Sequence, residues 1–264
     1  MIYYLLAGVV IRRNTIRLPS SMDKKRNIFI YFDYEREFGG HDTSISDRDI
    51  SVILDLLEKY HIRTTWFTVG KIFDKYPASV SMILAHGHEI GSHTWAHVPP
   101  LWTSRGVLEK DFFRFDELSG PLTEVKGFHP PNGKWSIITG MLLEKHGYFY
   151  DVVKADKVKV SADEYYTCLF TKKKIIRLYT KGDDWPLFNR NISAQSACEH
   201  FDNILNKTGI GELGGIGFHP WVLMSDSNIL EGFEMFISRL AVEENTNVNT
   251  VLHYVSILRQ RSTN

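Results

Sequence analysis

The sequence predicts an α/β fold in which parallel strands alternate with helices, and three observations support it. Short apolar runs rich in β-branched and aromatic residues, such as residues 28–32 and 64–69, alternate with segments of helical periodicity. The 264 residues are 43% hydrophobic and 23% charged, which allows one sizeable core. Titratable side chains follow several predicted strands, and α/β barrels gather their functional groups in the loops at that end. We therefore expect a barrel rather than an open sheet.

Start and stop signals delimit the predicted elements in chain order. Ser46 and Asp49 form a capping pair for the first helix, whose apolar residues recur at i, i+3, i+4 and i+7. The second helix begins near Pro77 and ends at Gly87, a typical C-terminal stop. The predicted strands lie at residues 28–32, 64–69, 90–92, 125–128, 148–153, 175–179 and 215–219. The predicted helices lie at residues 50–60, 77–86, 108–118, 137–145, 194–205, 229–240 and 250–258.

We expect residues 1–26 to form an N-terminal apolar segment and linker, and residues 27–264 to form one barrel domain. Residues 1–11 are apolar but too short for a membrane-spanning helix, which needs about 20 residues. Arginines follow this run and no small-residue cleavage site appears, which argues against a secretory signal. A membrane-surface anchor, an extra strand or a docking segment stays open, and Met22 is an alternative start. We expect a cytoplasmic protein, with any membrane association weak and peripheral.

Charge and cysteine content narrow the classes of function. The formal net charge is zero, so no basic field favours nucleic acid as a partner. Cys168 and Cys198 lack CxxC spacing, which indicates neither a zinc cluster nor a disulfide framework. Two free thiols are the simplest interpretation. The oligomeric state is not determined by the sequence.

His93 and His97 are candidates for a metal site. Two imidazoles at i and i+4 can converge on one ion, either on a helical turn or in a tight loop. A metalloprotease helix is excluded, because Thr94 stands where the glutamate base would be and Pro99 would end the helix. Taken alone, the pair fits a structural or surface role equally well.

Three further titratable residues follow predicted strands. Asp33 and Glu35 would point to the same face of an extended segment, where two carboxylates are costly unless a cation or proton separates their charges. The alternative is that both acids are simply solvated. Pro220 biases His219 toward an extended conformation, and a histidine at a strand end can protonate a leaving group. Taken alone, His219 also fits a histidine packed on Trp221.

The order of these motifs resembles the polysaccharide deacetylase (NodB-homology, carbohydrate esterase) family. The order is an Asp-bearing strand end, an HxxxH segment, a proline–glycine loop, an Asp-Trp pair and a late histidine, from about residue 27 to 222. Its most specific part is the GHEIGSHTWAH segment that ends at His97. The resemblance implies a distorted, usually seven-stranded (β/α) barrel. It also implies a hydrolase of non-peptide carbon–nitrogen bonds that removes an acetyl group from an N-acetylated sugar of a cell-envelope polysaccharide or saccharide precursor.

The resemblance also implies a divalent metal and a residue set to hold it. Zinc is expected first, with cobalt, nickel or iron as alternatives. Glu35, His93 and His97 would be the metal ligands, and Asp33 would be the general base for a metal-activated water. The usual motif has adjacent aspartates, whereas Tyr34 separates the two acids here, as in D-x-D or D-x-E variants. A backbone N–H near Tyr34 would help to stabilise the oxyanion.

Four more residues receive supporting or catalytic roles from the resemblance. His129 stands where the family's third motif begins with an arginine that orients and charge-balances the base. Asp184 and Trp185 resemble the fourth motif, in which the acid supports the catalytic histidine and the indole walls the pocket. His219 would be that histidine, the general acid for the departing amine.

Two other functions stay open. The first is the related branch that hydrolyses cyclic amides or other C–N bonds, sometimes without metal, and the spacing of Asp33 and Glu35 and the presence of His129 both favour it. The second is a catalytically silent barrel that binds glycan or a partner protein, for which His129 is the support. The complete set of carboxylates and histidines favours the metal-dependent deacetylase acting on a carbohydrate. The sequence does not identify the exact sugar.

Overall fold

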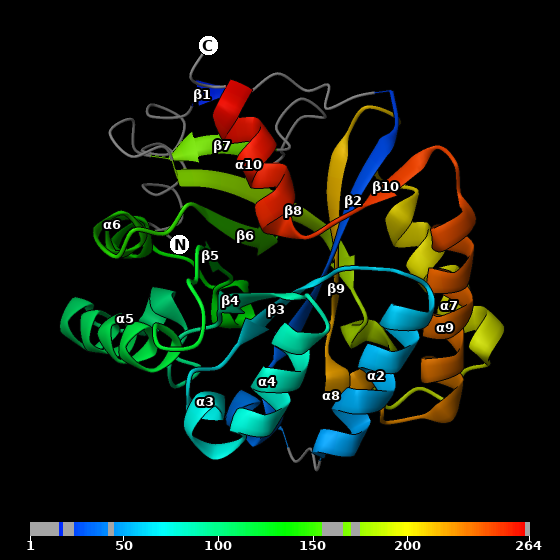
Figure 1. Cartoon of the computed structure of the whole chain (residues 1–264), viewed down its shortest axis with the longest axis horizontal. Helices are drawn as coiled ribbons and strands as arrows, with labels where there is room; N and C mark the ends of the chain where they lie inside the picture. The colour runs from blue at the N-terminus through cyan, green and yellow to red at the C-terminus, as the bar shows by residue number, and fades with distance from the viewer. Residues whose placement is uncertain (1–15, 18–23, 42–44, 155–165, 170–174, 262–264) are drawn as a thin grey trace.

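Figure 1 shows the computed structural model of the chain, which describes residues 16–17, 24–41, 45–154, 166–169 and 175–261. The barrel strands in these residues are β2 (Arg26–Tyr34), β3 (Thr65–Thr68), β4 (Glu89–Ser92), β5 (Gly127–Phe128), β6 (Tyr150–Lys154), β8 (Ile175–Asp183) and β9 (Leu213–Phe218). Each strand pairs in parallel with the next, and β9 closes the ring by pairing with both β8 and β2. The predicted seven-stranded (β/α) barrel is confirmed.

Three short strands extend the sheet beyond this ring. β10 (Thr246–Val248) pairs in parallel with β2. β7 (Tyr166–Leu169) pairs antiparallel with β8, and β1 (Ile16–Arg17) pairs antiparallel with β7. None of the three was predicted, because such short runs carry no periodic pattern. The remainder of the predicted apolar segment and linker, residues 1–15 and 18–23, lies outside the described residues.

Seven helices lie where the sequence predicts them. They are α2 (Asp47–Lys59), α4 (Pro77–Ala85), α5 (Arg105–Ser119), α6 (Ile137–Lys145), α7 (Ala194–Leu205), α9 (Ser227–Val242) and α10 (Val251–Arg261). The predicted capping pair is present, since Ser46 accepts from the Asp49 amide and Asp49 accepts from the Ser46 amide. Two short helices, α3 (Lys71–Lys75) and α8 (Pro220–Leu223), were not predicted. In the described ranges, no helix combines the length and apolar character that crossing a membrane requires.

The helices form two groups on opposite sides of the barrel (Figure 1). One group, α2, α4, α7 and α9, packs on the outer faces of β2, β3 and β9 in the largest hydrophobic cluster. The other group, α5 and α6, packs over β5 in a smaller cluster. Burial of these apolar faces contributes roughly 25 cal/mol per Å², so both helix groups stabilise the barrel.

Side chains along β2 alternate between the helix layer and the barrel interior. Ile30 and Phe32 belong to the outer cluster, whereas Phe29 and Tyr31 belong to an interior cluster. That interior cluster also includes residues of α10, whose first amides donate to side chains at the starts of β3 and β4. The helix α10 therefore closes the amino-terminal end of the barrel. The interior row ends at Asp33, so a charged group replaces the apolar filling at the carboxyl end.

Candidate active site at the carboxyl end of the barrel

Titratable side chains from five strands converge at the carboxyl end of the barrel. Asp33 lies near the end of β2, and His93, His129, Asp184 and His219 come directly after β4, β5, β8 and β9. Because carboxyl ends of parallel strands meet at one rim, Asp33, His129 and His219 line a single cavity of about 220 Å³. The sequence predicted these residues as a set because each follows a predicted strand, and the fold brings them together.

Glu35 lies between the two histidines of the HxxxH segment. Its Oε1 is 3.3 Å from Nε2 of His93 and 3.0 Å from Nε2 of His97, and the ligand atoms of all three lie within 4.8 Å of one another. Burial raises the pKa of Glu35, but its interactions with His93 and His97 outweigh it and hold this pKa well below its usual range. The three predicted ligands thus form one converging set, in which Glu35 and His93 are buried and His97 is partly buried.

The tautomer of His93 shows that a cation fits this set. Nδ1 of His93 lies 2.8 Å from the carbonyl oxygen of His129, and since a carbonyl only accepts, Nδ1 carries the proton. The neutral ring then presents a lone pair on Nε2 to the Glu35 carboxylate. Burial lowers the pKa of His93, which disfavours the doubly protonated ring. A cation between the ring and the carboxylate removes this conflict, as in metal sites whose histidines donate their other N–H to a carbonyl.

The HxxxH segment is a strained loop rather than a helical turn. Thr94 has φ of 61° and His97 has φ of 56°, both in the left-handed region that is costly for side chains with a Cβ, most of all for a β-branched one. The amide of Gly70 donates to the Thr94 carbonyl at 2.9 Å. A Cβ at Gly70 would lie 2.8 Å from the Trp95 Cα, so only glycine allows β3 and the loop to approach this closely.

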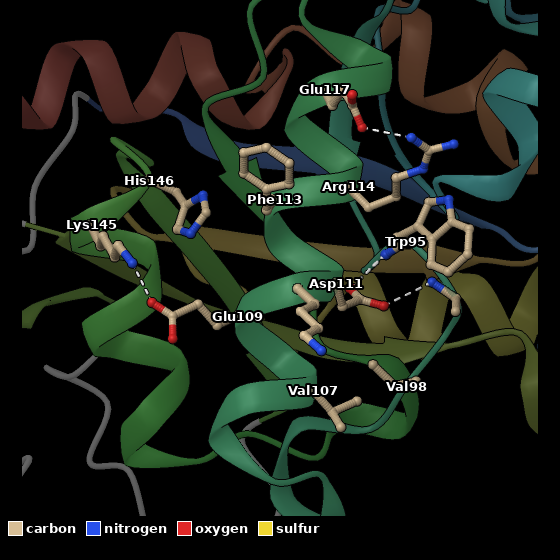
Figure 2. Close-up of a pocket in the computed structure, with 12 residues that line it drawn as sticks. Trp95, Val98, Val107, Glu109, Asp111, Phe113, Arg114, Glu117, Lys145 and His146 are labelled. Carbon is tan, nitrogen blue, oxygen red and sulfur yellow. Dashed lines mark hydrogen bonds and ion pairs between the residues drawn. The ribbon is translucent and has the colours of Figure 1, made fainter.

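Asp111, on α5, holds the outer side of the same loop. Its carboxylate accepts from the amide of Trp95 at 2.7 Å and from the amide of Ala96 at 3.0 Å, and Figure 2 shows both bonds. Burial raises the pKa of Asp111 to about 6, although the two amides oppose the shift. Asp111 was not among the predicted site residues. The available signal was an acid beside Leu108 and Phe112 in the buried stripe of a predicted helix.

Asp33 lies among three histidines. Its Oδ2 is 3.4 Å from Nε2 of His129 and 3.6 Å from Nε2 of His219, and its Oδ1 is 3.9 Å from Nδ1 of His93. Burial raises the pKa of Asp33, but its interactions with His129 and His93 outweigh it and lower this pKa to about 2. Among the described residues Oδ1 receives no hydrogen bond. Asp33 is therefore an ionised acceptor with one oxygen unoccupied by protein donors.

His129 has the contacts expected of a charge-balancing partner for the base. Its Nδ1 donates to the Val152 carbonyl at 2.7 Å, which fixes the ring and turns Nε2 toward Asp33. The ring also stacks against His93 with an interplanar angle of 9°. The ring of His129 therefore faces Asp33 from the position in which the resemblance places an arginine.

His219 and Asp184 form a buried pair on the other side of the cavity. Nδ1 of His219 lies 2.6 Å from Oδ1 of Asp184, and the His219 amide donates to Oδ2 at 2.8 Å. Burial lowers the pKa of His219, but the charge of Asp184 outweighs it and raises this pKa to about 10. Nε2 of His219 then carries a proton at neutral pH and faces the cavity.

Aromatic rings form one wall of the cavity. Trp185 is 43% exposed and lies edge-on to His219, with ring centroids 6.0 Å apart. His41 lies between Trp185 and Trp221 and stacks on Trp221 at 4.5 Å. The indole N–H of Trp221 donates to Glu35 at 3.4 Å. His41 and Lys154 line the cavity but were missed, because neither belongs to a motif with a recognisable spacing.

The predicted supporting role near Tyr34 concerns a backbone N–H, and the side chain of Tyr34 points away from the cavity. Tyr34 is fully buried in the outer cluster, donates to Ser79 at 2.8 Å and accepts from Arg36 at 2.6 Å. Strand alternation directs Asp33 inward and therefore Tyr34 outward. Only its backbone is left for a role at the cavity.

Fold and side chains define a (β/α) barrel with a carboxylate–histidine cluster at its carboxyl end. The family model for polysaccharide deacetylase matches residues 21–150, and the predicted resemblance to this family is confirmed. A peptidoglycan deacetylase of Helicobacter pylori is 35% identical over 101 residues, which are 38% of this chain and 34% of that protein. The chain thus matches only about a third of that relative's length.

Solved structures share the fold over almost the whole chain. A Mycobacterium smegmatis protein classed among the polysaccharide deacetylases superposes with a TM-score of 0.76, at 17% identity, over 94% of this chain and 95% of its own. The allantoinase PuuE superposes with a TM-score of 0.70, at 16% identity, over 90% of this chain and 92% of its own. At these identities the likeness shows a common barrel and leaves the reaction to be argued from the site.

Proposed function

We propose that this protein is a metal-dependent hydrolase that removes the acetyl group from an N-acetylated sugar. The observation that carries the proposal is the convergence of Glu35, His93 and His97, with Asp33 and His219 beside them and 3.6 Å from each other. Hydrolysis of an amide needs an activated water, a polarised carbonyl and a proton for the departing amine. This cluster supplies a group for each need.

Glu35, His93 and His97 would hold the metal. When bound there, a divalent ion supplies Lewis acidity for the acetyl carbonyl and lowers the pKa of water. Two imidazole nitrogens and one carboxylate oxygen suit zinc best, and cobalt, nickel and iron also accept such a set.

Asp33 would accept the proton of the attacking water. Its carboxylate is ionised at neutral pH because the surrounding histidines lower its pKa to about 2. Oδ2 faces His129 and His219, whereas Oδ1 is the oxygen that receives no bond from the described residues, so Oδ1 would take the proton.

His219 would donate a proton to the departing amine. Its raised pKa keeps the ring protonated until that step, and Asp184 fixes the tautomer by accepting from Nδ1. Trp185 and His41 would contact the sugar ring on the open side of the cavity, where the half-exposed indole of Trp185 offers a flat apolar face.

The similarity to a named peptidoglycan deacetylase supports this proposal over a different hydrolysis on the same barrel. That similarity exceeds 30% identity over a segment of 101 residues. A cyclic amide hydrolase is the second candidate, favoured by His129 in place of an arginine beside the base.

The test is acetate release by purified protein after chelation and reloading with Zn²⁺, Co²⁺, Ni²⁺ or Fe²⁺. Substrates would include N-acetylglucosamine oligosaccharides, peptidoglycan fragments and phosphate-linked N-acetylated sugars, with cyclic amides as a parallel panel. We expect acetate and the free amine in equal amounts from at least one sugar, only with metal. Full metal occupancy without acetate release from any sugar would contradict the proposal. Metal-independent opening of a cyclic amide would establish the second candidate instead.

A further inference from the structure

A second cavity adjoins the candidate active site on the flank of the barrel. Its volume is about 420 Å³, and it lies between the second half of β8 and the outer helix α7. Lys154, at the end of β6, lines both this cavity and the candidate active site, so the two hollows are neighbours. A ligand reaching past Lys154 would occupy both.

Positive charge is concentrated in this second cavity. Lys154, Lys181 and Lys207 line it together with one acid, Asp183, and with His200. Three lysines against one aspartate leave two net positive charges before any charge on His200 is counted. Because the whole chain has zero net charge, this concentration is a local feature rather than a general basic surface. We refer to these residues as the lysine cavity.

The backbone of β8 is shaped to build this cavity. Thr180 pairs with Gly215 and Gly182 pairs with Ile216, so Lys181 is the extra residue of a β-bulge. Such bulges occur beside functional sites and redirect a side chain out of the regular alternation. A Cβ at Gly182 would lie 2.9 Å from Ile204 of α7, so this strand and helix are in close contact below the bulge.

The lysines are held near one another by specific contacts. Lys207 Nζ donates to the Lys181 carbonyl at 3.1 Å, which fixes its ammonium group on the strand. Lys154 forms an ion pair with Asp183 at the mouth of the cavity. Burial lowers the pKa of Lys181, the nearby charge of Glu212 opposes this shift, and the charge of Lys207 adds to it. The ammonium groups repel one another, and Asp183 and Glu212 offset part of that repulsion, so a further anion in the cavity would reduce it again.

We propose that the lysine cavity binds the phosphate or pyrophosphate group of a phosphate-linked sugar whose acetamido group enters the candidate active site. The inference rests on the proposed deacetylase function and names its substrate class. A phosphate carries up to two charges and several acceptor oxygens, which matches the net charge of the cavity, and lysine is a common phosphate ligand. A carboxylate would balance only one of the two charges. An uncharged oligosaccharide would balance neither.

Binding of the anion can be tested without any catalysis. Inorganic pyrophosphate would be titrated calorimetrically into the wild-type protein and into Lys181→Gln/Lys207→Gln, at two salt concentrations. We expect the double variant to bind at least tenfold more weakly. Lys110→Gln is the matched control, because Lys110 lines the separate hollow of Figure 2 and should leave the affinity unchanged. Lys181→Arg/Lys207→Arg should bind pyrophosphate almost as tightly as wild type. That result would show that the Gln variant binds weakly because charge is lost and not because the protein is misfolded.

Kinetics then separate the sources of the phosphate. The substrates are a nucleotide-linked sugar, a polyprenyl-phosphate-linked sugar in detergent and a neutral N-acetylglucosamine oligosaccharide. The double variant should lose tenfold or more in kcat/KM through KM on one phosphate-linked substrate and should keep its rate on the neutral one. The proposal that the lysine cavity binds phosphate would be overturned by either of two results. One is equal pyrophosphate binding by wild type and double variant, and the other is an equal loss of kcat/KM on all three substrates. If pyrophosphate binding depends on the lysines but no sugar releases acetate, the cavity stands and the proposed reaction fails.

Discussion

The HxxxH loop separates two hollows of opposite character. On its inner side, His93 and His97 face the carboxylates of the cavity of about 220 Å³. On its outer side, Trp95, Ala96 and Val98 line a larger hollow of about 680 Å³ over α5 (Figure 2). The exposed surface of the larger hollow is mainly apolar, although charged residues also line it, and Phe113 is 63% exposed. Its size reflects loosely covered apolar surface, whereas the small cavity holds the mutually perturbed titratable groups that characterise functional sites.

The two sides of the loop also depend on different residues. The inner side relies on groups that would act on substrate, and the outer side relies on Asp111, which only holds the backbone. Changes on the inner side should remove activity with little effect on folding. Changes on the outer side should act through the position of the metal ligands.

Replacing the base should give the largest effect. Asp33→Asn keeps the shape of the side chain but removes the proton acceptor, so kcat/KM should fall by roughly 10²–10⁴-fold. Metal content should stay the same, because Asp33 is outside the ligand set. Steady-state kinetics with metal analysis on the same preparation checks this. Unchanged activity in Asp33→Asn would favour the silent barrel instead.

Replacing the partner of the acid should change the pH profile. In Asp184→Asn the pKa of His219 should drop toward its ordinary value of 6.5, because the main charge that raises it is lost. The alkaline limb of kcat/KM should move to lower pH, with a loss of tenfold or more at pH 8. A pH–rate profile that keeps the same alkaline limb would exclude His219 as the acid.

The same pair should affect stability in a defined pH window. Because the folded pKa of His219, about 10, lies above 6.5, its contribution to the free energy of unfolding is complete below pH 6.5 and is lost as pH rises through 10. Wild-type stability should therefore fall over this window more steeply than that of Asp184→Asn. Urea titrations of the metal-free proteins at several pH values measure the difference.

Loosening the outer side of the loop should weaken metal binding. Asp111→Asn replaces one acceptor oxygen by an amide donor, so the Trp95 or Ala96 amide loses its partner. We expect metal affinity to fall roughly 10–100-fold, as for other supporting residues of metal sites. Glu109→Gln is the control on the same helix, because Glu109 pairs with Lys145 at the surface. Competition with a chromogenic chelator gives the two affinities, and equal values would mean that the loop holds its shape without Asp111.

The smallest effect is expected in the apolar hollow. Phe113→Ser removes an exposed ring, so kcat/KM and metal affinity should stay within about twofold of wild type, as for surface changes in general. A larger loss of activity would connect this hollow with the site and weaken the distinction between the two sides of the loop.

The sequence predicted the parts of the molecule that follow local rules. The capping box at Ser46, the helices and most strands depend on short-range patterns. The HxxxH spacing, together with His219 late in the chain, predicted the position of the candidate active site. β8 was predicted to end at residue 179 but runs to Asp183, because its bulge breaks the alternation. β5 was predicted from residue 125 but begins at Gly127.

The residues that sequence reasoning missed act through tertiary contacts. Asp111 accepts hydrogen bonds from loop amides, and His41 stacks on Trp221 at the rim of the cavity. Lys154 lines both neighbouring cavities. No spacing along the chain encodes these contacts. The outward direction of Tyr34 could have been deduced, since alternation that turns Asp33 inward must turn its neighbour outward.

The left-handed backbone at Thr94 and His97 has a consequence for the order in which the molecule is assembled. Each such conformation costs about 1–3 kcal/mol, and an isolated loop would relax from it. The two imidazoles therefore reach their positions only once β3, β4 and α5 have packed around the loop. Chelation should leave the barrel folded, whereas mild denaturant should release the ion before the barrel melts. Metal retention would then report on the last native contacts to form and the first to be lost.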